Sequence, residues 1–135
     1  MGSDDIKWSE WTRSMERLLR LKTFPVGLKL YEDADDLNQN KWLRRPTEKL
    51  SLCQMITIVR TFDWTIGGVA EDLVTQGCAS VLGLSELSEF VTSGEMRSKV
   101  WLKHKGDAAE CERVIQRIPF GRFNAFALAP TAYDP

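Results

Sequence analysis

Three cysteines and one histidine are the residues of this 135-residue chain best suited to nucleophilic, redox or metal chemistry. Cys53 lies in a basic stretch near the start of an expected helix, and Cys78 follows a glycine at the start of another. Positive surroundings and unpaired N–H groups at a helix start both stabilise a thiolate. Cys111 is expected on the apolar face of a third helix, where a cysteine serves as a small core residue. Cys53 and Cys78 are therefore the candidate site residues.

The spacing of the cysteines argues against a zinc knuckle. Cys78 follows Cys53 by 25 residues and Cys111 follows Cys78 by 33, so the chain has no C-x-x-C element. Burial as small apolar residues stays open as an alternative for Cys53 and Cys78. If the two thiols converge on one pocket, they would act as a dithiol, as a reactive thiol beside an anion site, or as ligands of an iron–sulfur cluster or zinc. Two thiolates per chain complete a four-thiolate centre only in a homodimer or with a partner subunit.

The other motifs exclude several enzyme classes. His104 lies between two lysines, which is typical of an exposed turn, and a single histidine cannot supply both ligands of an H-E-x-x-H zinc site. The chain has no phosphate-binding loop of the Walker type. Gly67-Gly68 lacks the G-x-G-x-x-G spacing of a dinucleotide site, so we interpret this pair as a turn. These absences leave open whether the chain is an enzyme.

Four helices are expected to position these residues. The first covers 4–21 and is amphipathic, with basic residues opposite its apolar stripe. The second is buried and runs from about Ser51 to 62, capped by Ser51 or Thr47. A short helix follows over 78–83, ended by Gly83. The last covers 108–118, capped by Asp107, with Cys111 and Val114 on its apolar face. The stripe of the first helix contains Trp8, Trp11, Met15, Leu18, Leu19 and Leu21.

Strands are expected over 24–31, near 63–69 and over 123–129. The first alternates apolar residues and has Pro25 near its start, where proline costs least. The second is expected to break at its two glycines, and 99–102 also fits a strand. The segment 32–40 fits a loop or a weak helix. Together these elements predict one α+β domain, 1–135, with a small mixed sheet packed by several helices. Residues 1–3 are set aside as a native start or the remnant of an expression tag.

Composition places the chain among ordinary globular proteins. Apolar residues make up 43% of it, and 18 basic against 19 acidic residues give a net charge of −1. The lack of a basic excess argues against a nucleic-acid partner. No apolar stretch is long enough for a membrane span, and no secretory signal opens the chain. The odd number of cysteines favours a reducing, cytoplasmic setting.

Five tryptophans in 135 residues support an alternative function. Trp8, Trp11 and Trp42 lie in the more polar N-terminal third, and tryptophan is enriched at the energetic centres of protein interfaces. The chain would then be a non-catalytic interaction subunit of a larger complex. The competing interpretation is that these rings close a small core.

The order of several short elements resembles the DUF169 family. These elements are Pro25-Val26-Gly27-Leu28-Lys29, Leu52-Cys53-Gln54, Gly77-Cys78-Ala79, Leu82-Gly83-Leu84 and the tail 124–130. In one departure from the family pattern, Cys78 is followed by alanine and not by proline. Most members are longer, so the resemblance covers nearly all of this chain and the N-terminal part of the family pattern. The chain would be a short relative, a subunit completed by a partner, or a fragment.

The DUF169 resemblance indicates which residues are site candidates. It does not indicate a reaction, because the family is largely uncharacterised. It implies that Cys53, Gln54 and Cys78 are the positions to test, and we expect them to bind a small molecule, redox cofactor or metal in one pocket. Arg60 is a weaker electrostatic candidate, since it lies seven residues, about two helical turns, beyond Cys53. A homo-oligomer or a complex with a partner subunit is expected.

Overall fold

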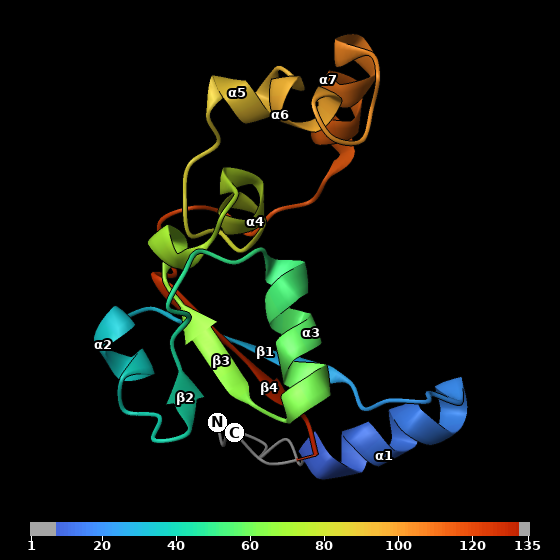
Figure 1. Cartoon of the computed structure of the whole chain (residues 1–135), viewed down its shortest axis with the longest axis vertical. Helices are drawn as coiled ribbons and strands as arrows, with labels where there is room; N and C mark the ends of the chain where they lie inside the picture. The colour runs from blue at the N-terminus through green and yellow to red at the C-terminus, as the bar shows by residue number, and fades with distance from the viewer. Residues whose placement is uncertain (1–7, 133–135) are drawn as a thin grey trace, which may run out of the picture.

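The computed structural model describes residues 8–132 and contains a four-stranded mixed sheet flanked by helices (Figure 1). The strand order is β1-β4-β3-β2. The C-terminal strand β4 (Ala125–Pro130) pairs antiparallel with both β1 (Val26–Tyr31) and β3 (Thr65–Gly68). A short strand, β2 (Leu43–Arg44), pairs parallel with β3. This architecture confirms the predicted α+β fold class.

One face of the sheet is covered by α3 (Leu52–Phe62), as Figure 1 shows. Ser51 and Gln54 form a capping box at the start of this helix. The Ser51 side chain accepts from the Gln54 N–H, and the Gln54 side chain accepts from the Ser51 N–H at 2.8 Å. Two free N–H groups are thereby satisfied, which confirms Ser51 as the cap. The buried core on this face consists of Met55, Val59, Ile66, Leu73, Ala79, Leu82, Leu84, Phe126 and Leu128.

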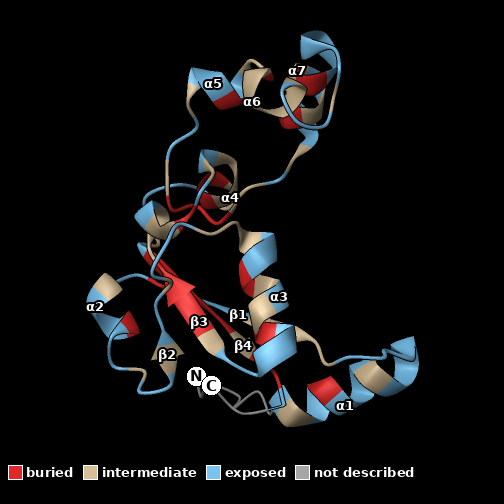
Figure 2. Ribbon diagram, in the orientation of Figure 1, coloured by how far each residue is buried: buried red, intermediate tan, exposed pale blue. Residues whose placement is uncertain are grey.

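The opposite face of the sheet is lined by small residues. Because alternate residues of a strand face opposite sides, Gly27 and Lys29 of β1 share this face with Ala127 of β4. At one end it is covered by α2 (Ala34–Leu37), whose Leu37 is fully buried in a second apolar cluster (Figure 2). The expected loop or weak helix at 32–40 therefore includes a short helix that closes this cluster.

Gly67 and Gly68 are the last two residues of β3, so the prediction of a turn at this pair is wrong, although the strand does end there. A Cβ atom on Gly67 would lie 2.3 Å from the carbonyl oxygen of Phe126 on β4. The two strands therefore approach each other more closely than any larger residue allows.

The amphipathic helix α1 (Trp8–Leu19) projects to one side of the molecule (Figure 1). Thr12 is its buried residue, and the Thr12 hydroxyl donates to the carbonyl of Thr131 at 3.0 Å. Trp11 and Leu18, which belong to the apolar stripe, are 63% and 74% exposed. The helix was predicted over 4–21, of which 4–7 lie outside the described residues. Its period is confirmed, but much of its apolar stripe faces away from the core.

The segment between β3 and β4 forms the far end of the molecule, away from α1 (Figure 1). A single 3-10 turn (Ala70–Asp72) leads to α4 (Gln76–Val81), which starts two residues before the predicted position. It is followed by α5 (Glu89–Thr92), α6 (Glu95–Ser98) and α7 (Lys105–Val114).

Two predictions for this end are wrong. Residues 99–102 do not form a strand, because the N–H groups of Trp101 and Leu102 both donate to the carbonyl of Arg97 and close a turn. The last helix starts at Lys105, before the predicted cap Asp107. Its buried residues are Ala108 and Glu112, whereas Val114 is 72% exposed, so the predicted apolar face is not the one that packs.

A buried ion pair network holds this helical end together. Glu112 of α7 has a side chain only 3% exposed, and its carboxylate accepts from Arg97 Nε at 2.7 Å and from the guanidinium of Arg117. Arg117 Nε also donates to the Ser80 hydroxyl of α4 at 3.3 Å. One carboxylate thus links α6 and α7 to α4, which packs on the main core.

Candidate functional site

Leu50 and Leu73 form an isolated parallel bridge that joins the segments leading into α3 and α4. The Leu50 N–H donates to the carbonyl of Asp72, and the Val74 N–H donates to the carbonyl of Leu50, both at 3.0 Å. Each chain then enters a helix almost at once, α3 after the Ser51 cap and α4 after the Thr75 cap. The bridge therefore holds the segments that lead into these two helices side by side.

A cysteine lies in the first turn of each of these helices. Cys53 is the second residue of α3 and is exposed, while its carbonyl accepts from the Thr57 hydroxyl at 2.9 Å. Cys78 is the third residue of α4 and is half-buried against the main core cluster. Its N–H donates to the cap hydroxyl of Thr75 at 3.3 Å. One thiol of the pair is thus open to solvent, and the other is held by the core.

A thioether also lies next to the α4 cysteine. A Cβ atom on Gly77 would lie 3.2 Å from Sδ of Met96 and closer still to its methyl group. Met96 of α6 therefore packs against the residue that precedes Cys78. This places a soft sulfur donor beside that helix, which the sequence alone did not indicate.

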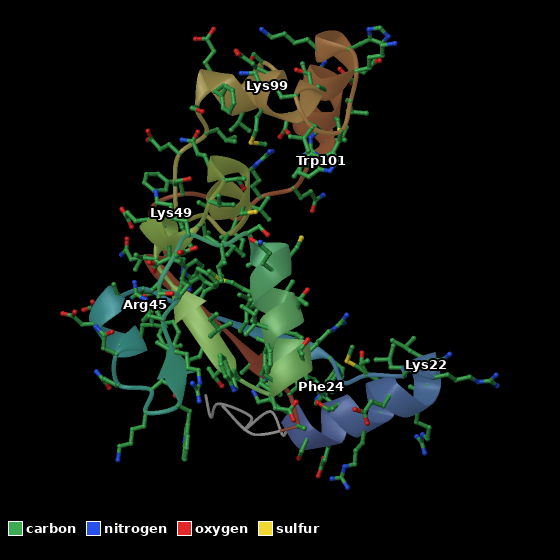
Figure 3. The ribbon with its side chains drawn as sticks, in the orientation of Figure 1. Lys22, Phe24, Arg45, Lys49, Lys99 and Trp101 are labelled. Atoms are coloured by element: carbon green, nitrogen blue, oxygen red, sulfur yellow. The ribbon has the colours of Figure 1, made fainter. Side chains whose placement is uncertain are left out.

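The basic stretch before Cys53 is partly neutralised. Arg45 and Lys49, labelled in Figure 3, lie on the segment that runs from β2 to α3. The guanidinium of Arg45 pairs with the carboxylate of Asp72, and the Val69 N–H donates to the same carboxylate at 2.9 Å. This ion pair links the segment before α3 to the segment before α4, as the Leu50–Leu73 bridge does.

The remaining site candidates lie in different surroundings. Gln54 is adjacent to Cys53, but its side chain oxygen is used in the capping box. Arg60 lies in the last turn of α3 and is exposed, about 10 Å along the helix axis from Cys53. Cys111 is half-buried on α7, in the helical end held by Glu112. Cys53 and Cys78 thus each follow the Leu50–Leu73 bridge by a few residues, whereas Cys111 lies on another helix.

The thiols do not form a complete metal centre within one chain. Among residues 8–132, no group of three or more His, Cys, Asp or Glu side chains is placed to hold a metal ion. A four-coordinate thiolate site built on this pair needs donors from elsewhere.

A cavity on the second face of the sheet was not predicted from the sequence. It has a volume of about 410 Å³ and is lined by Trp8, Lys29, Tyr31, Asn40 and Thr65 over small residues of β1 and β4. The alternation in the strand 24–31 indicated that Gly27 and Lys29 share a face, but not that this face stays open. That outcome depends on how far α1 and α2 cover the sheet.

The fold and the site define an α+β protein with one thiol in the first turn of each of two helices whose leading segments are bridged. The chain belongs to the DUF169 family, described as uncharacterised ArCR, whose family model matches residues 14–134. This match confirms the resemblance drawn from the short sequence elements. No curated protein and no solved structure matches the chain. Within residues 8–132, no helix is both long and apolar enough to cross a lipid bilayer.

Proposed function

We propose that this DUF169 protein is a cytoplasmic protein that binds a redox cofactor or soft metal through Cys53 and Cys78. The observation that carries this proposal is the parallel bridge between Leu50 and Leu73, which holds together the segments that lead into the two helices containing these cysteines. Thiolates are the preferred protein ligands of zinc and of iron–sulfur clusters. The two cysteines also lie in the family-like sequence elements, whereas Cys111 does not.

The exposure of Cys53 supports a ligand shared between two chains. A closed thiolate centre requires about four donors. One chain offers two cysteines, Cys53 and Cys78, in the helices that follow the bridged segments. An exposed thiol beside a half-buried one can reach a ligand at the surface, where a second copy supplies the matching pair. The proposed assembly is therefore a homodimer that holds one ligand across its interface.

The experiment that tests this function is anaerobic purification followed by a visible spectrum, metal analysis and a thiol count on the same sample. Cys53→Ser and Cys78→Ser are compared with Cys111→Ser, which removes a half-buried thiol from another part of the fold. We expect bound iron or zinc that is lost in the first two variants and kept in the third. A colourless, metal-free protein whose thiols react alike in all variants would contradict the proposal.

An interaction subunit is the second candidate function, and α1 is the observation that favours it. Trp11, Leu18 and Leu19 are exposed on one side of this helix, which joins the fold through the buried Thr12. Trp42 and Trp101 are exposed elsewhere. Exposed tryptophan and leucine on a helix are typical of a surface that docks on another protein.

A further inference from the structure

The cavity on the second face of the sheet is a pocket formed by small residues. Gly27 of β1 pairs with Ala129 of β4, Lys29 pairs with Ala127, and Ala127 also pairs with Gly67 of β3. Gly27, Ala127 and Ala129 therefore form a floor of small residues, whereas Leu43 of β2 packs over Gly67. The volume of about 410 Å³ lies within the range of small-molecule sites.

The walls of this cavity are aromatic at two places. Trp8, at the start of α1, and Tyr31, at the end of β1, both line it. Two rings above a floor of methyl groups favour a flat apolar body over a branched or strongly hydrated one.

The polar groups of the cavity are mainly donors. Lys29 Nζ lies 5.0 Å from the ring centre of Tyr31, and no carboxylate among residues 8–132 forms an ion pair with it. The Asn40 side chain oxygen accepts from the Trp42 N–H at 3.0 Å, so the amide NH₂ is the end that remains to donate. Thr65 adds a hydroxyl. Among residues 8–132, no Asp or Glu lines this cavity.

Two carboxylates line an adjoining cavity, and both are already engaged. Glu32 and Asp36 line that neighbouring space together with Lys29. Glu32 pairs with Arg122 at 3.1 Å, and Asp36 accepts from the Gln39 side chain at 3.1 Å. Lys29 is therefore the cation available to a ligand in the pocket.

We infer that this pocket binds a small organic anion, a carboxylate carried on a flat apolar body. The flat body lies on the alanine and glycine floor between Trp8 and Tyr31, and the carboxylate accepts from Lys29 and Asn40. This site is distinct from the proposed thiol site, because neither Cys53 nor Cys78 lines the cavity. The two proposals therefore succeed or fail independently.

The test uses 2-naphthoate as the probe and its neutral amide, 2-naphthamide, as the matched ligand, with binding followed by ligand-observed NMR and calorimetry. We expect 2-naphthoate to bind more tightly than the amide. Lys29→Met should weaken naphthoate binding about tenfold, because it removes one hydrogen bond to a charged group, and should leave amide binding nearly unchanged. Lys22→Met, which removes an exposed lysine that does not line the cavity, is the control and should change neither.

A cavity-filling variant keeps the test independent of charge. Ala129→Leu places a larger side chain on the floor of the pocket and should abolish binding of both probes while the circular dichroism spectrum stays native. Cys53→Ser and Cys78→Ser should bind both probes normally. Equal affinity for the two probes, no binding of either, or full naphthoate binding by a folded Ala129→Leu protein would overturn the inference. The last result would assign the probe to another surface, such as the exposed face of α1.

Discussion

Leu50 and Leu73 lie side by side in a parallel bridge although 22 residues separate them along the chain. Two backbone hydrogen bonds of 3.0 Å hold the bridge, and the Arg45–Asp72 ion pair lies beside it. Both segments enter helices shortly after this contact, α3 with Cys53 in its first turn and α4 with Cys78 in its first turn. The bridge therefore ties together the two segments that lead to the candidate cysteines.

The first prediction tests the bridge itself. Val74→Pro removes the N–H that donates to Leu50, and the extended backbone of the preceding Leu73 (φ −91°, ψ 132°) is compatible with a following proline. We expect a loss of about 1 kcal/mol in unfolding free energy together with weaker metal binding by the thiols. Ala34→Pro, at the first residue of α2 and after the extended Asp33 (φ −106°, ψ 128°), is the control, because it introduces a compatible proline on another element. Equal metal binding in both variants would show that the bridge does not position the site.

The second prediction concerns the buried carboxylate of the helical end. Glu112→Gln leaves Arg97 and Arg117 without their counter-charge in a site that is almost closed to solvent. Urea unfolding should show a loss of about 3 kcal/mol or more. Glu110→Gln breaks an exposed ion pair with Arg113 on the same helix and should cost less than about 1 kcal/mol. Similar losses in the two variants would mean that the Glu112 network contributes no more than a surface pair.

The third prediction compares two glycines. Gly67→Ala forces a methyl group against the backbone of β4 and should cost about 1–3 kcal/mol of unfolding free energy. Gly106→Ala, in the first turn of α7 with open space around it, should instead stabilise the protein by about 0.5–1 kcal/mol. Thermal melts of both variants measure this difference. A neutral Gly67→Ala variant would contradict the close approach of β3 and β4.

The fourth prediction tests α1 as a protein-docking surface. If a second copy binds its apolar side, Trp11→Ser and Leu18→Ser should shift the protein toward monomer in sedimentation velocity experiments over a range of concentrations. Trp101→Ser is the matched control, because Trp101 is similarly exposed but lies in the turn after α6. If the wild-type protein is a monomer at all concentrations, the docking partner of this surface is a different protein. Unchanged association in both α1 variants would exclude the surface from self-association.

Much of the fold can be predicted from local sequence patterns. The helix capped by Ser51 and the strands around Val26 and Phe126 follow from apolar periodicity and capping residues, which act over a few positions. β2 is only two residues long and is defined by its pairing with β3, which no local pattern contains. The glycines of β3 suggested a break because their strand role depends on a neighbouring backbone far along the chain.

For the candidate site, too, local sequence patterns predicted some features and missed those that depend on distant parts of the chain. Cys53 and Cys78 could be selected from residue type and position near helix starts, but the long-range bridge between Leu50 and Leu73 that precedes both helices could not. The pocket around Lys29 was missed because an open sheet face is defined by the elements that fail to cover it. Val114 was assigned to the wrong face because the buried carboxylate of Glu112, and not an apolar stripe, anchors α7.

The most direct test of the thiol site is an anaerobic titration of the reduced, metal-free protein with cobalt(II), whose thiolate complexes absorb in the near ultraviolet. The proposal predicts thiolate-to-cobalt absorption that saturates at about one ion per two chains, as expected for four thiolates shared by a dimer. Cys111→Ser should give the same endpoint, and Cys53→Ser and Cys78→Ser should each lose it. Absence of the thiolate bands, or the same titration in all three variants, would contradict a shared site at Cys53 and Cys78.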